Sequence, residues 1–299
     1  MRILVSGASG LVGSALVPAL REDGHRLWRL VRGAAGAEDA VRWDPAAGEI
    51  DRPALAACAP EGVVHLAGES IAGGRWTAAK KARIRDSRVR GTELLARACA
   101  ALETPPRLFV SASAIGYYGD RGEQLVDEDS PPGTGFLAGV CRRWEAAAEP
   151  VRQAGARLVW LRLGVVLAKE GGALAQMLTP FRLGLGGKVG SGRQWLSWIA
   201  LDDVVGVVRH LLAQDGIAGP LNTVAPQPVR NRELTRALGR ALKRPAVLPL
   251  PAFAARLILG EMADELLLAS TRVDASRLVA SGYAFRWPQL EPLLAHLLA

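Results

Sequence analysis

MRILVSGASGLVGSALVPALREDGHRLWRLVR, residues 1–32, is the stretch of sequence that decides the fold of this chain. Residues 2–6 are a short apolar run with branched side chains, which is typical of a buried strand. Residues 11–21 carry apolar side chains at helical spacing, and residues 27–31 form a second apolar run. Strand, helix and strand in this order predict a βαβ unit.

Three glycines separate the first strand from the helix. Gly7, Gly10 and Gly13 stand in the pattern GxxGxxG, in which one glycine is displaced relative to the familiar GxGxxG. Glycine lets the backbone turn sharply and approach a phosphate without a Cβ in the way. The first N–H groups of the helix then point at the phosphates, with the positive end of the helix dipole behind them. The turn therefore predicts a dinucleotide-binding site.

The end of the second strand selects the cofactor. An acidic residue there would accept a hydrogen bond from the ribose 2′-OH of NAD, whereas an arginine suits the 2′-phosphate of NADP. The strand ends at Arg32 with no acid beside it, and Glu38 and Asp39 come too late in the chain. We therefore expect NADP(H), although Arg32 could also be one of many surface arginines.

Composition limits the class of protein. The chain has 299 residues and 49% hydrophobic residues, enough for one large α/β domain and a smaller lobe. No apolar run reaches membrane-spanning length, and the chain enters a strand directly, so we expect no signal peptide and a cytoplasmic location. Cys58, Cys99 and Cys141 are widely spaced, which predicts neither a disulfide framework nor a metal site.

The net charge of +8 raises the question of nucleic acid. The basic residues are spread along the chain and are nearly all arginine. The one dense patch, residues 75–90, is either a solvated helix face or a contact to ligand phosphates. We expect a small-molecule substrate, with no nucleic acid and no membrane as partner.

Strands alternate with helices through the remaining chain, which predicts an α/β fold with a Rossmann-like, doubly wound parallel sheet. Further strands are expected at residues 41–43, 62–67, 107–113, 156–167, 195–200 and 222–224. Helices are expected at residues 53–58, 76–101, 136–154, 173–181, from 202 onward, 231–242, 252–259 and 261–270, and the segments 271–282 and 288–298 complete a small helical lobe. Asp202 and Asn231 are expected N-caps. We expect residues 1–225 to form the NADP-binding domain, with 168–198 contributing to the substrate lobe, and residues 226–299 to form a helical substrate-capping domain.

Several of these segments resemble the extended short-chain dehydrogenase/reductase superfamily, in its NAD-dependent epimerase/dehydratase group. The resemblance rests on GASGLVG at 7–13, VVHLAG at 63–68, GTELL at 91–95, FVSASAIGYYG at 109–119 and WIALDDVV at 198–205. A narrower "epimerase family protein" subgroup is indicated by RWT at 75–77, SRVRGT at 87–92, LAGVCRRWE at 137–145, LGGKVGSGRQWLSWI at 185–199 and PLPAFAARLILGEMADELLLAS at 249–270. The last of these resembles that subgroup's own C-terminal helical domain.

The resemblance and the βαβ argument together give a set of expected cofactor-binding residues. They are Gly7, Ser9, Gly10, Leu11, Val12, Gly13, Arg32, Leu66, Ala67 and Gly68. His65, within the same motif, is expected to be a packed residue rather than an acid or base.

The chain departs from the family at the catalytic pair. The superfamily uses Tyr-x-x-x-Lys on the helix after the serine strand, and those positions fall here at Leu137 and Cys141. Tyr117 and Arg121 have the spacing but lie in a glycine-rich loop. The superfamily's helix asparagine is also missing, with Arg88 near its place.

Three residues remain as expected catalytic groups, namely Ser113, Tyr117 and Tyr118, with Arg88 or Lys188 as the source of positive charge. The alternative is that these are binding residues only. The leading hypothesis is therefore an NADP(H)-dependent epimerase-like oxidoreductase acting on a small polar, sugar-like substrate. The second hypothesis is a non-catalytic NADP(H)-binding protein that senses redox state, and we expect a monomer or a weak homodimer.

Overall fold

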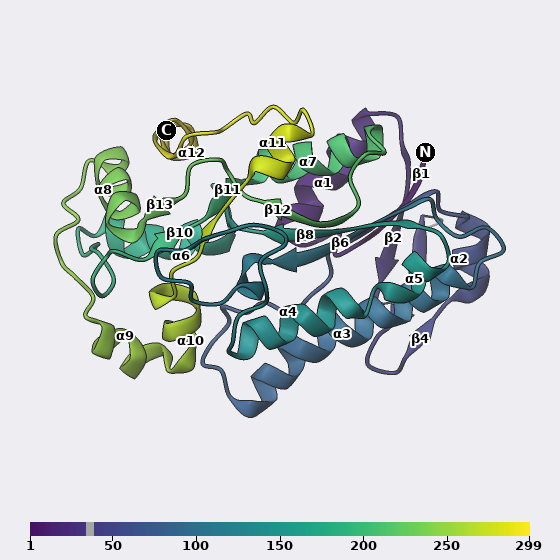
Figure 1. Ribbon diagram of the computed structural model, residues 1–299, viewed down its shortest axis with the longest axis horizontal. Coiled ribbons are helices and arrows are strands. Elements are labelled where there is room, and N and C mark those ends of the chain that lie inside the picture. Colours follow the sequence, from purple (N-terminus) through teal and green to yellow (C-terminus); the bar gives the residue numbers. More distant parts are fainter. Residues whose placement is uncertain (34–38) are drawn as a thin grey trace.

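The computed structural model describes residues 1–33 and 39–299, and its centre is an eight-stranded sheet (Figure 1). The strand order is β12-β8-β6-β5-β1-β2-β3-β4, and only the β3–β4 pair is antiparallel. The strands are β1 (Arg2–Ser6), β2 (Arg26–Val31), β3 (Ala40–Asp44), β4 (Glu49–Ile50), β5 (Gly62–His65), β6 (Leu108–Ala114), β8 (Arg157–Leu163) and β12 (Gly219–Thr223). The predicted doubly wound parallel sheet is therefore confirmed. The strand order reverses beside β1, and open α/β sheets bind ligands at such a point, which predicts a ligand crevice at the carboxyl ends of β1 and β5.

Helices cover both faces of the sheet because strand side chains alternate between two apolar cores. Ile3 and Val5 pack with α1 (Leu11–Glu22) and α7 (Leu201–Ala213) on one face. Leu4 packs on the other face, which is covered by α3 (Ala78–Ala100) and α5 (Glu149–Gln153). The helices α2 (Arg52–Cys58) and α4 (Phe136–Ala146) lie on that second face, and α11 (Ser276–Ala280) lies beside β12.

A second lobe lies beyond the carboxyl ends of the strands, at the left of Figure 1. Its core joins Trp198, Leu174, Leu234 and Leu293, which come from segments far apart in the chain. Its elements are β9 (Val165–Leu167), α6 (Gly172–Arg182), β10 (Trp195–Leu196), β11 (Trp198–Ala200), β13 (Val229–Arg230), α8 (Asn231–Leu242), α9 (Ala252–Leu259), α10 (Glu261–Ala263), a π-helical turn η2 (Asp264–Leu268) and α12 (Leu290–Leu298). The segment 168–198 thus packs with the C-terminal helices, while the boundary at residue 225 stays a prediction.

Two short connections complete the chain between the lobes. A 3₁₀ turn, η1 (Ile115–Tyr117), follows β6, and β7 (Leu125–Val126) pairs in parallel with β14 (Arg272–Val273). Tyr118 and Val273 belong to one small apolar cluster with these strands. The C-terminal segment therefore returns to pack beside the loop that carries the predicted catalytic tyrosines.

Several predicted elements are interrupted. The expected helix 136–154 is two helices, α4 and α5, because Pro150 in the first turn of α5 cannot continue the hydrogen-bonding pattern of α4. The expected strand 156–167 breaks at Gly164, where a Cβ would lie 2.8 Å from the Ser197 carbonyl oxygen. The expected strand 195–200 breaks at Ser197 itself, and the expected helix 261–270 is α10 followed by η2.

Both predicted N-caps are wrong. Ala200 is the N-cap of α7, so Asp202 lies in the first turn of the helix, where its negative charge interacts favourably with the helix dipole. Arg230 is the N-cap of α8, and the Asn231 side chain instead accepts a hydrogen bond from the Val189 N–H at 2.9 Å. That bond ties the loop before β10 to α8.

Two findings concern features of the whole described chain. Within residues 1–33 and 39–299, every helix is too short or too polar to cross a bilayer. Cys58, Cys99 and Cys141 are all buried and free.

Candidate cofactor and active site

The glycine turn after β1 is closely packed against two other backbone segments. Gly7 has φ of +69°, and a Cβ there would lie 2.8 Å from the Leu66 carbonyl carbon. At Gly13 a Cβ would lie 2.1 Å from the Gly7 carbonyl oxygen. Only glycine fits at these two positions, so the turn, the start of α1 and the end of β5 are held close together.

The N-terminus of α1 begins at a glycine, so its N-cap residue supplies no capping side chain. Its N-cap residue, Gly10, makes no side-chain hydrogen bond, and no acid lies in the first turn. The helices α2 and α3 differ, since Asp51 and Thr77 cap them. The first N–H groups of α1 are therefore left for an anion, and Ser9 and Gly10 are exposed at the turn. These features fit the pyrophosphate of a dinucleotide.

A buried polar chain fixes the end of β5 next to this turn. The Ser6 hydroxyl accepts hydrogen bonds from the N–H groups of Leu66 (3.1 Å) and Ala67 (3.2 Å) and lies 2.6 Å from Nδ1 of His65. With both acceptor positions of Ser6 in use, the hydroxyl donates to Nδ1, and Nε2 carries the proton toward Thr92 Oγ1 at 2.9 Å. Burial lowers the pKa of His65 to about 4, so the ring is neutral. His65 is a packed residue, as predicted.

Arg32 follows β2, which flanks β1 on the side opposite β5. It is exposed directly after β2, and its charge contributes to lowering the pKa of Glu69, an effect dominated by the 2.8 Å hydrogen bond from Lys80. Asp39 accepts hydrogen bonds from Arg21 (3.0 Å) and Arg29 (2.8 Å), which hold its carboxylate. Asp39 is thus held by other partners, and Glu38 lies outside the described residues.

Helix α4 presents an apolar side chain and a thiol to the loop after β6. A Cβ at Gly116 would lie 3.3 Å from Leu137 Cβ and 3.9 Å from Cys141 Sγ. Burial raises the pKa of the Cys141 thiol to about 12, so it stays protonated at neutral pH.

Arg88 supplies positive charge beside α4. A Cβ at Gly68 would lie 3.2 Å from Arg88 Cζ, which places the guanidinium against the segment that follows β5. Nη1 of Arg88 donates to the carbonyl oxygens of Glu69 (2.9 Å) and Ile84 (3.1 Å), and Cζ lies 5.0 Å from the Trp144 ring centroid. A fixed cation therefore lies between the end of β5 and α4, and the choice between Arg88 and Lys188 as the charge in catalysis stays a prediction.

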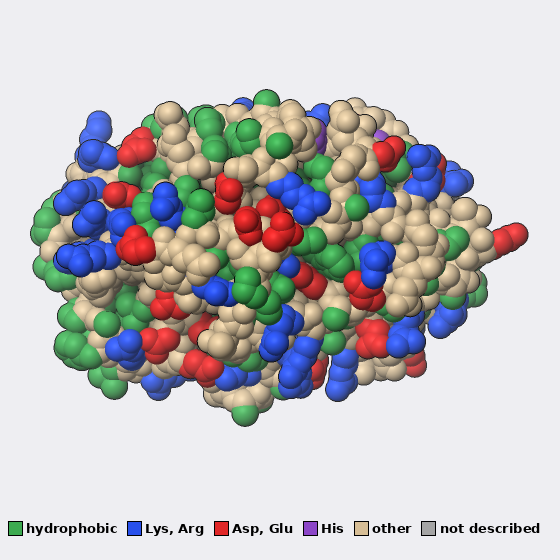
Figure 2. Space-filling view, viewed as in Figure 1, with side chains coloured by type: hydrophobic (Ala, Val, Ile, Leu, Met, Phe, Trp, Pro, Cys, Tyr) green, Lys and Arg blue, Asp and Glu red, His purple; other side chains and the backbone are tan. Residues whose placement is uncertain are grey.

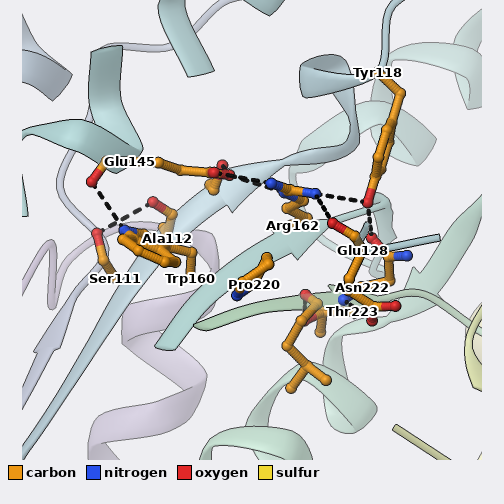
Figure 3. A network of polar contacts seen from close by, with 12 residues as sticks. Ser111, Ala112, Tyr118, Glu128, Glu145, Trp160, Arg162, Pro220, Asn222 and Thr223 are labelled. Carbon is orange, nitrogen blue, oxygen red and sulfur yellow. Dashed lines mark hydrogen bonds and ion pairs between the residues drawn. The ribbon is translucent and has the colours of Figure 1, made fainter. Parts of the chain in front are cut away.

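A buried ion pair lies under the ends of β6, β8 and β12 (Figure 3). Arg162 donates to both carboxylate oxygens of Glu145, each at 3.0 Å, and the two side chains are 3% and 11% exposed. Ser113 Oγ donates to the same carboxylate at 2.7 Å. Nη1 of Arg162 donates to the Tyr118 hydroxyl at 2.9 Å, and that hydroxyl donates to Asn222 Oδ1 at 2.6 Å.

The model of the NAD dependent epimerase/dehydratase family matches residues 3–222, and that of a domain of unknown function, DUF1731, matches residues 250–297. The chain belongs to the NAD-dependent epimerase/dehydratase family.

This family member is similar to three proteins over nearly its whole length. Epimerase family protein Mb2239 of Mycobacterium bovis is 44% identical over 283 residues, covering 95% of this chain and 93% of that protein. The crystal structure of human epimerase family protein SDR39U1 (isoform 2) with NADPH has a TM-score of 0.89 and 34% identity, covering 100% of this chain and 99% of that one. The nucleoside-diphosphate sugar epimerase of Corynebacterium glutamicum has a TM-score of 0.81 and 36% identity, covering 99% of this chain and 57% of that one. The resemblance to the epimerase family protein subgroup with its own C-terminal domain is confirmed.

In this epimerase/dehydratase family member the three predicted catalytic residues are not equivalent. Ser113 is 2% exposed and Tyr118 is fully buried, and both are bonded within the ion-pair network. Burial raises the pKa of Tyr118 to about 12, although its contacts to Arg162 oppose the rise. Tyr117 alone is partly exposed, and Arg162 Cζ lies 3.6 Å from its ring centroid. Tyr117 is thus the partly exposed member of the three, while Ser113 and Tyr118 are buried and bond to the Glu145–Arg162 pair that lies against its ring.

Sequence reasoning missed Glu145, Arg162 and Asn222. Arg162 carried a signal, because it is the one charge inside the apolar run LVWLRLGVVL at 158–167, and buried arginine needs a partner. Lys188 lies elsewhere, in a loop against α8. Among the described residues, no cluster of His, Cys, Asp and Glu is arranged to hold a metal ion.

Proposed function

We propose that this protein is an NADP(H)-dependent oxidoreductase of the epimerase type, which acts on a small polar, sugar-like substrate without a Tyr-x-x-x-Lys pair. The observation that carries the proposal is the uncapped N-terminus of α1 at the glycine turn, with Arg32 across the crevice. Support comes from the NADPH named for the human SDR39U1 structure and from the sugar epimerase named for the C. glutamicum structure.

Different residues bind different parts of the cofactor. N–H groups of the turn and of the first turn of α1, from Ser9, Leu11 and Val12, bind the pyrophosphate, while the three glycines allow its approach. The Arg32 guanidinium binds the 2′-phosphate as a bidentate donor. Leu66, Ala67 and Gly68 line the crevice on the β5 side. Bound nicotinamide supplies or accepts hydride.

The proton is handled by residues of the loop after β6 rather than by α4. The Tyr117 phenol donates a proton to the carbonyl oxygen of the substrate, and Arg88 stabilises the negative charge that develops there. Arg162 orients the Tyr117 ring, and Ser113 and Tyr118 hold the Arg162–Glu145 pair in place. Leu137 has no proton to give, and Cys141 keeps its own, because its pKa is about 12.

The cofactor assignment is tested by Arg32→Asp. Loss of a charge-assisted bidentate contact is worth about 1.5–3 kcal/mol, so the affinity for NADPH should fall about 10- to 100-fold while that for NADH changes little. Titration followed by nicotinamide fluorescence measures both. The matched control is Arg26→Asp, an exposed arginine at the start of β2, which should leave the ratio of affinities unchanged. If the ratio of NADPH to NADH affinity is the same in wild type and Arg32→Asp, Arg32 does not determine selectivity for NADP.

The catalytic assignment is tested by Tyr117→Phe with NADPH and a panel of sugar carbonyl substrates. Turnover should fall by about 10²- to 10⁴-fold, the usual contribution of a positioned acid, with NADPH affinity unchanged. Ser113→Ala and Tyr118→Phe should reduce turnover less. If all three variants turn over as wild type does, the proton donor lies elsewhere.

A second candidate function is a non-catalytic NADP(H)-binding protein that senses redox state. The observation that favours it is the face of α4 toward Gly116, which offers only Leu137 and Cys141. This alternative predicts tight NADPH binding without oxidation in the presence of any carbonyl substrate, and a partner that distinguishes NADP⁺ from NADPH. NADPH oxidation that Tyr117→Phe abolishes would exclude it.

A further inference from the structure

A cavity of about 670 Å³ lies in the second lobe, between α8, the loop before β10 and the segment that precedes α9. Four cationic side chains line it, Lys188, Arg193, Arg232 and Arg236, together with Thr235 and Val247. It shares no residue with the crevice at the ends of β1 and β5. The matched domain of unknown function begins at residue 250, so the cavity lies at its edge.

Backbone hydrogen bonds fix the walls of this cavity. The Arg232 N–H donates to the Gly192 carbonyl at 3.0 Å, and the Leu250 N–H donates to the Lys188 carbonyl at 2.9 Å. At Gly187 a Cβ would lie 1.8 Å from the Leu248 carbonyl oxygen, so the two loops are in direct backbone contact. Together with the bond from Val189 to Asn231, these contacts hold three separate segments in one arrangement.

Gly192 brings two of the cations together. Its φ is +69°, and a Cβ there would lie 3.1 Å from Lys188 Cβ and 3.2 Å from Arg232 Cβ. The two side-chain stems therefore start on either side of one glycine. Arg236 follows Arg232 by one helical turn and lies on the same face of α8.

The four charges have no acidic partner within the described part of the chain. Two other arginines at α8 differ, because Arg230 pairs with Glu123 at 2.8 Å and Arg240 pairs with Glu291 at 3.3 Å. Basic side chains gather over α8 at the left of the space-filling view (Figure 2). Like charges held around one concavity repel, and an anion bound among them would remove that cost.

We propose that this cavity binds a small organic phosphate that carries at least two negative charges. The volume lies within the range of small-molecule sites, and a concave site suits a small ligand better than a bilayer or a nucleic acid duplex. Arginine forks match phosphate oxygens in pairs, and the Thr235 and Ser191 hydroxyls add neutral donors. Val247 and its neighbours Ala246 and Pro249 form an apolar wall for the organic part of the ligand.

The test is isothermal titration of the full-length protein, saturated with NADPH, using inorganic pyrophosphate and UDP as probes. Saturation occupies the α1 site, so the heat reports a second site. The variant Arg232→Gln/Arg236→Gln should bind both probes at least about 10-fold more weakly, with unchanged NADPH affinity. Arg240→Gln on the same helix is the matched control and should bind as wild type does, because its side chain does not line the cavity.

Three results would overturn the proposal. The first is no binding of either probe at millimolar concentration, and the second is equal affinity in wild type and the double variant. The third is binding of duplex DNA or phosphatidylglycerol vesicles that the double variant loses while pyrophosphate and UDP fail to compete. The circular dichroism spectrum shows whether each variant is folded, and both altered residues are exposed, so the fold should not change.

Discussion

Glu145→Gln is the most direct test of the buried ion pair between α4 and β8. The glutamate carboxylate accepts three hydrogen bonds, one from Ser113 and two from Arg162. Glutamine has the same shape but removes the negative charge, and its amide nitrogen is a donor that must face another donor. The Arg162 guanidinium then stays buried without a carboxylate, and its acceptors are the one amide oxygen of the glutamine, the Tyr118 hydroxyl and the Glu128 carbonyl.

The expected loss of stability follows from the burial of the pair. Breaking a buried ion pair by removing one partner costs about 3–5 kcal/mol, and the uncharged acceptors that Arg162 keeps place this case near the lower end, at about 3 kcal/mol. With an unfolding entropy of about 2.1 cal/mol/K per residue over the whole chain, this loss lowers the Tm by about 5 °C. Burial alone would lower the pKa of Arg162, but the contacts to Glu145 and Tyr118 raise it, so the guanidinium remains charged and cannot escape the penalty by losing its proton.

Urea unfolding followed by tryptophan fluorescence measures this free energy, and the matched control is Glu93→Gln. Glu93 pairs with Arg97 on the exposed surface of α3, and such pairs are worth less than about 1 kcal/mol. A double-mutant cycle with Arg162→Met should give a coupling energy of about 1–3 kcal/mol. The reasoning is refuted if Glu145→Gln costs no more than Glu93→Gln.

Two other perturbations test the first strand and its turn. Gly13→Ala should lower stability and abolish NADPH binding, since its Cβ would lie 2.1 Å from a carbonyl oxygen. Gly139→Ala on α4 has open space around it and should raise stability by up to about 1 kcal/mol. Thermal unfolding and NADPH titration distinguish the two variants. The contribution of neutral His65 to the free energy of unfolding is complete above pH 6.5 and is lost as the pH falls toward 4. In this range the histidine is protonated in the unfolded chain but stays neutral in the folded chain. Unfolding free energy should therefore drop by up to about 1.4 kcal/mol per pH unit in this window, and a His65→Asn variant with the same slope would contradict this.

The first half of the fold could be predicted because its signals are local. Residues 1–32 contain a complete βαβ unit, and the strand lengths, the helix spacing and the glycine turn all indicate the same structure. The residue that holds the end of β5, His65, was also predicted correctly as packed. Such features depend on neighbours within a few residues or on one adjacent strand.

The breaks in the later strands could not be predicted, because their causes are distant. Gly164 interrupts a continuous apolar run only because the Ser197 carbonyl approaches it from another strand. Asn231 looks like a cap in sequence, yet its side chain bonds to Val189 in a loop that local rules do not place. Tertiary contacts override capping preference at such positions.

The sequence groups Ser113, Tyr117 and Tyr118 without showing which of them is buried, and their catalytic role stays a prediction. Ser113, Tyr117 and Tyr118 do lie together at the end of β6, but sequence alone does not show which hydroxyl is buried. That depends on Asn222 of β12, more than a hundred residues later, whose Oδ1 accepts a hydrogen bond from the Tyr118 hydroxyl. A motif therefore places a group of side chains, and the packing of distant strands determines which of them stays partly exposed.

Contacts at both ends of helix α4 fix its position. In the proposed mechanism the helix therefore positions the site, although it supplies no acid or base of its own. At its start, the Glu265 carboxylate from the second lobe accepts from the N–H groups of Phe136 (2.5 Å) and Leu137 (2.9 Å). Near its end, Glu145 binds Arg162, which supports the Tyr117 ring. Helix α4 therefore connects the second lobe to the ion pair that lies against the loop after β6, and in the proposed mechanism it positions that loop while Tyr117 supplies the proton.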